Sequence, residues 1–238
     1  MHVEKKLERI VKFILDDCVP PVLRDQRAFM SPLFRLIFGR KAKHFVAFRE
    51  NILKINHEQI LTMYKEAQEV AIHQHGSDLS GEMLKIVSSA VVGERILDAG
   101  GGNALLGKAI GEGRQVTVCD IVLDDAVLKA NPDITFRKSR VEDLPFETSQ
   151  FDTVISTHTL EHVPDIASAV AELRRVAKER LIVVLPKERP YRFAFNYHLH
   201  FFPYEYSVAC LFSQGTVVPP GEIKCIGDSW YYQEDVGP

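Results

Sequence analysis

The spacing of apolar positions along the chain changes near residue 90. Before that point apolar residues recur three to four positions apart, which is the spacing of one face of a helix. They include Leu7, Ile10, Val11 and Ile14, and further along Ile52, Ile55, Ile60 and Met63. Pro20-Pro21 and Ser31-Pro32 are expected to divide this region into separate helices, because proline starts or ends a helix. Residues 1–80 are therefore predicted to form a helical N-terminal cap.

From residue 94 onward, short apolar segments alternate with amphipathic ones. Strands are predicted at residues 94–99, 114–120, 133–138, 151–157 and 179–186, and helices at residues 104–110, 124–130 and 162–178. One further strand is predicted at residues 223–233. Strands that alternate with helices form parallel βαβ units. The fold class predicted for residues 81–238 is therefore α/β, a doubly wound and mostly parallel sheet that binds ligands at the carboxyl ends of its strands.

The composition is that of an ordinary globular protein. The 238 residues are 46% hydrophobic and 26% charged, and the net charge of −3 gives no general signal for nucleic acid. The four cysteines lie far apart, which argues against a zinc ribbon or a disulfide scaffold. No apolar run approaches the roughly 20 residues that span a bilayer, and the charged opening residues lack the apolar core of a signal peptide. A cytoplasmic protein that does not bind nucleic acid is expected.

A glycine-rich loop directly follows the first predicted strand, in ILDAGGGNALLG. Glycines let the backbone take positive φ angles and approach a ligand closely. The dinucleotide signature G-x-G-x-x-G matches only at Gly100 and Gly102, because Leu105 occupies the third glycine position. Asp120 ends the next strand about 20 residues later, where a carboxylate can accept hydrogen bonds from two ribose hydroxyls. A nicotinamide dinucleotide and S-adenosylmethionine both fit this pattern, and a tight turn without a ligand is the remaining alternative.

Four segments follow one another in a recognisable order and spacing. They are ILDAGGGNA at residues 96–104, VTVCD at 116–120, VEDLPFETSQFDTVISTHTLEHVPD at 141–165 and LIVVLP at 181–186. In the third, an acidic residue, Leu-Pro-Phe and a short polar gap precede the Phe-Asp that opens a buried strand. With these segments the chain resembles the class I, Rossmann-like, S-adenosylmethionine-dependent methyltransferases, in particular the subgroup that methylates small molecules, lipids and glycans. The resemblance covers residues from about 80 to 190.

The resemblance implies S-adenosylmethionine as the cofactor. Nine positions are implied as cofactor contacts, in the order methionine end, ribose, adenine and sulfonium: Asp98, Gly100, Gly101 and Gly102; Asp120; Ile121, Val141 and Glu142; and His158. Many members of the family carry an acid just before the Val141 position, where it accepts a hydrogen bond from the adenine amino group. Arg140 stands at that place in this chain, which leaves Glu142 or a backbone carbonyl to make the contact.

His158 is the candidate catalytic residue. Methyl transfer from a sulfonium is an in-line displacement, and alignment of the reacting groups can be worth about 7–11 kcal/mol. A hydroxyl acceptor also loses a proton, and a histidine with an ordinary pKa of about 6.5 suits a general base. The alternative is that His158 or His162 only caps or packs the helix that follows.

Candidate substrate-binding residues are Tyr197, His198 and His200, in the aromatic run that follows the fifth predicted strand. The resemblance implies that this region covers the substrate, and a packed aromatic core is the alternative. HTLEH at residues 158–162 also fits the H-x-x-E-H pattern of some zinc peptidases, whose ligands share one face of a helix. Because the segment follows a strand and Pro164 comes soon after, we expect a strand-to-helix turn without a metal.

Residues 24–49 mix arginine and lysine with phenylalanine and leucine. The simpler interpretation is a helical cap that shows its charges to water. The alternative is a segment that contacts an anionic membrane, or that binds a phosphate-bearing lipid or glycan substrate.

The predicted function is transfer of a methyl group from S-adenosylmethionine to a small-molecule, glycan or lipid-linked acceptor, at oxygen. One alternative is a catalytically silent relative that binds the cofactor. Another is an NAD-dependent oxidoreductase, which Leu105 and the block at residues 141–152 disfavour.

Overall fold

The chain divides into two compact units. The first contains residues 1–59 and 189–198, and the second contains residues 60–188 and 199–238. The computed structural model describes residues 14–39, 48, 54, 58–59, 62, 79–190, 192–193, 196–213 and 218–237. Within this part of the chain no helix is long and apolar enough to cross a membrane. The division into domains at residue 80 stays a prediction.

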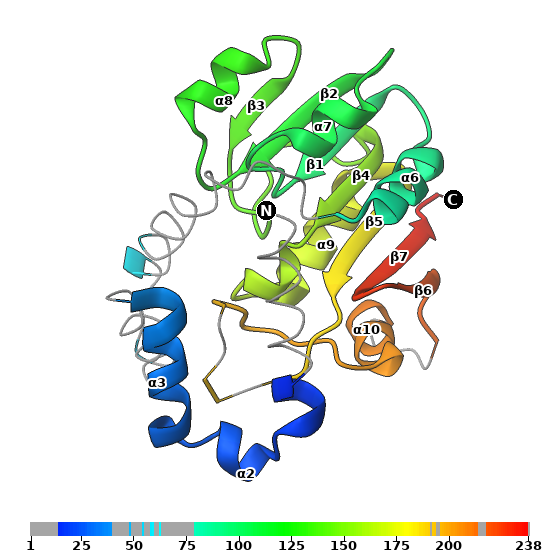
Figure 1. Cartoon of the computed structure of the whole chain (residues 1–238). Helices are drawn as coiled ribbons and strands as arrows, with labels where there is room; N and C mark the ends of the chain where they lie inside the picture. Colours follow the sequence, from blue (N-terminus) through cyan, green and yellow to red (C-terminus); the bar gives the residue numbers. More distant parts are fainter. Residues whose placement is uncertain are drawn as a thin grey trace. The chain divides into compact units, whose positions relative to one another are not determined.

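The second unit is built on a seven-stranded sheet (Figure 1). Its strands are β1 (Arg95–Ala99), β2 (Gln115–Asp120), β3 (Thr135–Lys138), β4 (Phe151–Thr157), β5 (Ala177–Pro186), β6 (Glu222–Ile226) and β7 (Ser229–Asp235). They lie in the order β3-β2-β1-β4-β5-β7-β6. β7 runs antiparallel to both of its neighbours, whereas the other neighbouring strands pair in parallel. The predicted α/β class with a mostly parallel sheet is confirmed.

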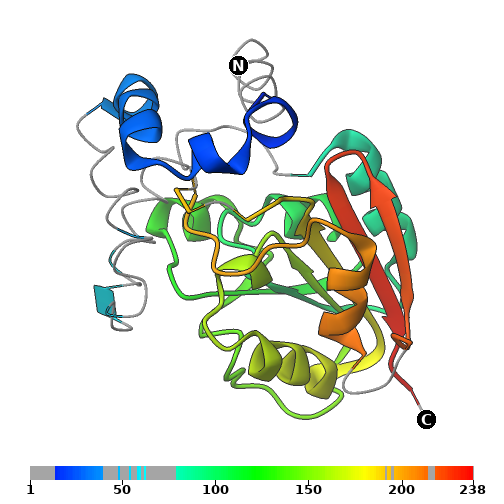
Figure 2. The ribbon, with the colours of Figure 1, turned by 90° about the horizontal axis from the view of Figure 1, so that it is seen from below.

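Helices cover both faces of this sheet (Figures 1 and 2). On one face lie α6 (Gly81–Ala90) and α7 (Leu105–Ile110), and on the other lie α9 (Ile166–Val176) and α10 (Glu205–Phe212). A shorter helix, α8 (Asp125–Ala130), connects β2 to β3. Successive side chains of a strand point to opposite faces, so Ile182 packs in the α6 and α7 layer while Val183 packs in the other. The same central strands therefore contribute side chains to both core layers.

Most element boundaries agree with the sequence patterns to within two or three residues. The strand predicted at residues 151–157 is β4 with the same bounds. The helix predicted at residues 162–178 is shorter, because His162 ends a 3₁₀ turn, η3 (Leu160–His162), residues 163–165 connect this turn to α9, and β5 begins at Ala177. α9 itself begins after Asp165, whose Oδ1 accepts a hydrogen bond of 3.0 Å from the backbone N–H of Ser168. An aspartate at this position satisfies one of the free N–H groups of the first turn.

The C-terminal segment forms two strands, so the single strand predicted at residues 223–233 is wrong. β6 and β7 are joined at Gly227 and Asp228, and Gly227 has a φ of +63°, a conformation that glycine adopts without strain. This two-residue connection is typical of a β-hairpin. β7 then lies between β5 and β6, where Trp230 and Tyr232 become buried.

In the first unit, η1 (Ile14–Cys18, a π-helix), α2 (Pro21–Arg24) and α3 (Arg27–Phe38) are described. Pro21 starts α2 as predicted, but Pro32 lies inside α3 and does not end it. A proline inside a helix costs about 3 kcal/mol, whereas burial of each large apolar side chain contributes roughly 1.5–3 kcal/mol. Met30 and Phe34, which flank the proline, are both fully buried and offset that cost. The helices predicted before residue 14 and around residues 52–63 lie almost wholly outside the described residues.

A buried ionic cluster joins α9 to β7. Nε and Nη2 of Arg174 donate to the two carboxylate oxygens of Glu234 at 2.5 and 2.7 Å, and the hydroxyl of Tyr232 also donates to Glu234. The ring of Phe212, from α10, stacks on Tyr232 with 3.7 Å between ring centres. Three elements that are distant in the sequence are thereby fixed at one edge of the sheet.

Substitution of Glu234 tests the cost of this cluster. Glu234→Ala leaves the Arg174 guanidinium buried without its carboxylate, and we expect the free energy of unfolding to fall by about 3–5 kcal/mol. Urea denaturation followed by circular dichroism measures the change. The double variant Arg174→Met/Glu234→Leu should recover most of the loss, because no charge remains buried. An equal fall in the free energy of unfolding in the single and double variants would show that lost packing, not the unpaired charge, causes the destabilisation.

Candidate cofactor site

The loop after β1 is held in place by the end of β2. The N–H of Gly100 donates to the carbonyl of Cys119 at 2.7 Å, and the N–H of Gly102 donates to Oδ2 of Asp120 at 3.0 Å. Oδ1 of the same carboxylate accepts from the N–H of Val122 at 3.0 Å. Asp120 is buried, so these bonds fix both the loop and the orientation of the carboxylate.

Two of the loop glycines occupy positions where a larger residue does not fit. Gly100 has a φ of +87°, and a Cβ there would lie 2.1 Å from Oγ1 of Thr159. A Cβ on Gly101 would lie 2.4 Å from Oδ2 of Asp98. The loop therefore passes over Asp98 and against the turn after β4 as bare backbone. A ligand at this edge would meet peptide groups rather than side chains.

Asp98, which precedes the loop on β1, is completely buried. Neither carboxyl oxygen has a hydrogen-bond partner of ordinary geometry among the described residues. Burial, together with the nearby charge of Asp120, raises the pKa of Asp98 to about 7, and the amide of Gly107 is close enough to oppose this slightly. A buried acid without a partner is costly, and this one lies directly beneath the glycine loop.

The residues predicted at the adenine edge lie in the loops after β2 and β3. Val141 is buried and Ile121 is half-buried. Glu142 is ion-paired with Arg140, whose Nη2 lies 2.7 Å from Oε1. This hydrogen bond raises the pKa of Arg140. Arg140 stands where many family members carry an acid. It thus forms an ion pair with Glu142, the carboxylate expected to contact the adenine amino group instead.

His158 lies at the carboxyl end of β4 in a strained conformation, with a φ of +50°. Its N–H donates to the carbonyl of Val184 at 2.9 Å, which fixes it against β5. Its Nδ1 lies 3.6 Å from Oε1 of Glu161, a carboxylate that is only 1% exposed. Positive φ angles in residues other than glycine are uncommon and concentrate at functional sites.

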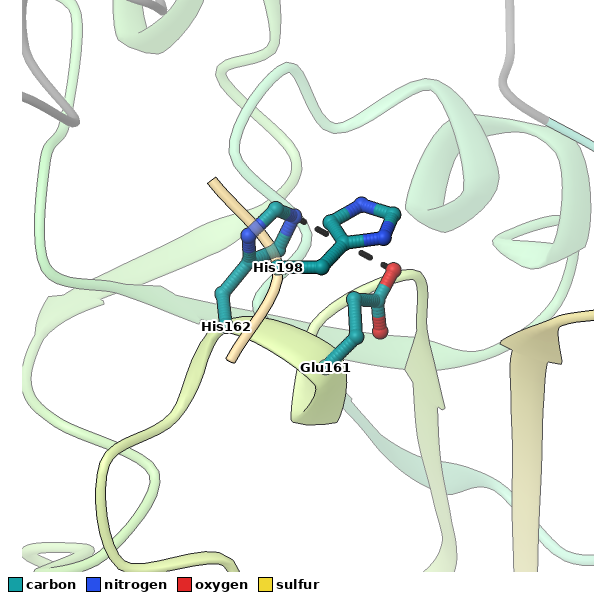
Figure 3. A group of neighbouring side chains, drawn as sticks. All are labelled: Glu161, His162 and His198. Atoms are coloured by element: carbon teal, nitrogen blue, oxygen red, sulfur yellow. Dashed lines mark ion pairs between the residues drawn. The ribbon is translucent and has the colours of Figure 1, made fainter. Parts of the chain in front are cut away.

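Glu161 was not predicted as part of the site. It lies on η3 with His162, and the ion pair between its Oε1 and Nε2 of His162 measures 4.0 Å (Figure 3). The spacing H-x-x-E was the available signal, because His158 and Glu161 lie three residues apart in the short segment that leads from β4 into η3. The turn expected for HTLEH is confirmed. The absence of a metal stays a prediction.

The three predicted substrate-binding residues fall in different units. His200 belongs to the second unit, where its Nε2 bonds the carbonyl of Val163 at 2.8 Å and its N–H donates to the carbonyl of Glu161 at 3.0 Å. Tyr197 and His198 belong to the first unit, where the ring of Tyr197 packs edge-on against Phe48. Their role as substrate ligands stays a prediction.

The sheet order and the glycine loop after β1 define a Rossmann-like cofactor-binding domain. Residues 97–185 match the family model described as a methyltransferase domain. The chain carries a class I, S-adenosylmethionine-dependent methyltransferase domain, and the resemblance noted in the sequence is confirmed.

Curated relatives share this domain over part of their length. A "Ubiquinone biosynthesis O-methyltransferase" of Paracidovorax citrulli is 38% identical over 95 residues, which are 36% of this chain and 40% of that protein. The Hahella chejuensis protein of the same name is 33% identical over 99 residues, covering 38% of this chain and 41% of that protein. The matched part thus spans less than half the length of these relatives.

A solved structure shows the same fold over a larger part of the chain. The Burkholderia thailandensis 1,6-didemethyltoxoflavin-N1-methyltransferase, with bound 1,6-didemethyltoxoflavin and S-adenosylhomocysteine, aligns with a TM-score of 0.55 and 14% identity. The alignment covers 84% of this chain and 92% of that one. It supports the Rossmann-like methyltransferase architecture of the sheet and its helices.

Gly101→Ala should disturb the site without changing the loop's length. The new Cβ would meet the Asp98 carboxyl, so we expect lower thermal stability, and cofactor affinity reduced about tenfold or more. Gly81→Ala is the matched control, because its Cβ would meet nothing within 4 Å. Differential scanning fluorimetry and calorimetric titration with S-adenosylhomocysteine measure the two effects. Equal behaviour of the two variants would show that the loop can move away from Asp98.

Proposed function

We propose that this protein transfers a methyl group from S-adenosylmethionine to a hydroxyl of a small-molecule, glycan or lipid-linked acceptor. The observation that carries the proposal is the bare glycine backbone between Asp98 and Asp120, within a methyltransferase domain. The names of the two curated relatives support oxygen as the acceptor atom. S-adenosylmethionine supplies the activated methyl group on its sulfonium.

The residues of the loop fit this cofactor. The buried Asp98 carboxyl suits the ammonium group at the methionine end, since it has no other cation to balance it within the described residues. We assign the backbone of Gly100, Gly101 and Gly102 to the same end, and Asp120 to the ribose hydroxyls. Oδ2 of Asp120 accepts from the N–H of Gly102 and Oδ1 accepts from the N–H of Val122, which holds the carboxylate at the end of β2.

The adenine contacts remain a proposal of the same kind. Ile121 and Val141 provide the apolar surface for the ring. Glu142 borders the ring edge, but its pairing with Arg140 favours a backbone carbonyl as the acceptor for the adenine amino group.

We assign His158 as the general base that removes the proton of the acceptor hydroxyl. The nearby carboxylate of Glu161 favours a proton on Nδ1, which would leave Nε2 as the accepting nitrogen. Tyr197, His198 and His200 remain the proposed substrate contacts. Packing of the turn after β4 is the alternative role for His158.

Calorimetric titration with S-adenosylmethionine, S-adenosylhomocysteine and NAD tests the cofactor. Micromolar binding of the first two, with none of NAD, is expected. Asp120→Ala should weaken that binding about 100-fold, because it removes hydrogen bonds to a charged acceptor. Binding of NAD alone would contradict the proposal, and unchanged affinity in Asp120→Ala would show that the ribose lies elsewhere.

The base assignment is tested by His158→Ala. We expect turnover to fall by about 10²–10⁴-fold while cofactor affinity is retained. His162→Ala is the matched control, since His162 also faces Glu161 but is not assigned as a base. Turnover is measured as S-adenosylhomocysteine release with a panel of hydroxylated acceptors. Equal losses in both variants would indicate a structural role for the turn.

We also propose that α3 contacts an anionic membrane surface that presents a lipid-linked acceptor. Phe29 and Leu36 are 42% and 83% exposed and lie seven positions apart, on one face of the helix. Arg35 is exposed at the border of that face, and Met30 and Phe34 are buried on the opposite one. Apolar side chains beside exposed arginine are typical of helices that lie in a lipid interface. The basic residues at 40–43 lie outside the described residues.

Vesicle co-sedimentation tests this contact. Phe29→Ser/Leu36→Ser should reduce binding to phosphatidylglycerol vesicles by about tenfold or more, because two apolar side chains no longer enter the lipid. Val218→Ser is the control, because Val218 is also strongly exposed but lies outside α3. The same binding to phosphatidylcholine and phosphatidylglycerol vesicles, or no binding to either, would contradict the proposal.

A further inference from the structure

We propose that binding of the cofactor expels a proton from Asp98, so that cofactor and proton compete at the methionine end of the site. The inference rests on the proposed function, because it takes the glycine loop as the cofactor site. It adds a property that methyl transfer does not require, namely that cofactor affinity depends on pH.

The Asp98 carboxyl lies between apolar neighbours and the glycine loop. Its neighbours on the flanking strands, Val118 of β2 and Ile155 of β4, are fully buried and apolar. On the side of the loop, the backbone of Gly101 lies so close that a Cβ would come within 2.4 Å of Oδ2. A ligand that reaches the loop backbone is therefore in position to act on this carboxyl.

The groups around Asp98 favour its neutral form. Burial is the larger cause, and Asp120 is the charged group that acts on Asp98. The Cys119 thiol, whose pKa is raised to about 12 chiefly by burial, is neutral near pH 7. From β4, the hydroxyl of Ser156 donates to the carbonyl of Ala99 and adds no charge. Burial and the neighbouring carboxylate together raise the pKa of Asp98 to about 7, against an opposing effect of the Gly107 amide.

An ammonium ion beside the Asp98 carboxyl would favour its ionised form over its protonated form. Both S-adenosylmethionine and S-adenosylhomocysteine carry an α-ammonium group, and a positive charge within a few ångströms favours the ionised carboxyl. Protonated Asp98 plus the α-ammonium group of the ligand gives an ion pair plus one free proton, which the buffer takes up. At pH 6 each binding event should release close to one proton, and at pH 8 it should release almost none.

Proton release can be measured by calorimetric titration of the full chain with S-adenosylhomocysteine. The titration is run in phosphate and in an amine buffer of high ionisation enthalpy, at pH 6 and pH 8. At pH 6 the two buffers should give heats that differ by the buffer ionisation heat of nearly one proton. At pH 8 the heats should agree, and affinity should be about tenfold higher than at pH 6.

Two variants assign the proton to its residue. Asp98→Asn should bind more weakly at pH 8, with an affinity that does not change between pH 6 and pH 8 and with no proton release. Asp133→Asn, at an exposed aspartate before β3, should behave as the wild type. Folding is checked by thermal denaturation without ligand. Because the folded-state pKa of Asp98 is raised from 3.8, its stabilising contribution is lost as pH rises through about 7. Asp98→Asn should therefore be more stable than the wild type at pH 8.

The outcomes separate this inference from the proposed function. Binding with equal heats in both buffers at pH 6 would overturn the inference and leave the cofactor assignment standing. Proton release that persists in Asp98→Asn would assign the proton to another group and would also overturn it. Failure of the wild type to bind either S-adenosylmethionine or S-adenosylhomocysteine at any pH would overturn the proposed function itself.

Discussion

The two amide hydrogen bonds accepted by Asp120 are the interaction on which the cofactor site depends. They join the end of β2 to the glycine loop through Gly102 and to its own following loop through Val122. The parallel register of β1 and β2 sets Ala99 beside Cys119, so the two loops leave the sheet at the same level. One carboxylate therefore bonds to both loops.

The same arrangement is energetically costly. Two acids lie close together at the ends of adjacent strands, and one of them, Asp98, is completely buried with no hydrogen bond of ordinary geometry within the described residues. Native proteins rarely retain such a group without a functional reason, because desolvation is unfavourable. In the proposed complex an ammonium group beside Asp98 would relieve this repulsion, so the feature that weakens the free protein would favour the bound one.

On the other side of the site, the turn after β4 connects the proposed base to the segment that follows β5. The side chain of Glu161 faces His158, while its carbonyl accepts hydrogen bonds from the N–H groups of Leu199 and His200. A shift of this turn would move the histidine and the segment together. The proposed base and the segment after β5 are thus joined through one residue, Glu161.

The sequence by itself determined the α/β class, the strands from β1 to β5, the glycine loop and the family resemblance. These depend on local spacing and on short motifs, which are properties of neighbouring residues. Tertiary structure alone decided that Asp98 is buried beside a second acid, that Arg140 pairs with Glu142, and that Pro32 is tolerated inside α3. It also decided that Tyr197 and His200 belong to different units. Burial, pKa and long-range pairing depend on which distant residues pack together, and no spacing within one segment contains that information.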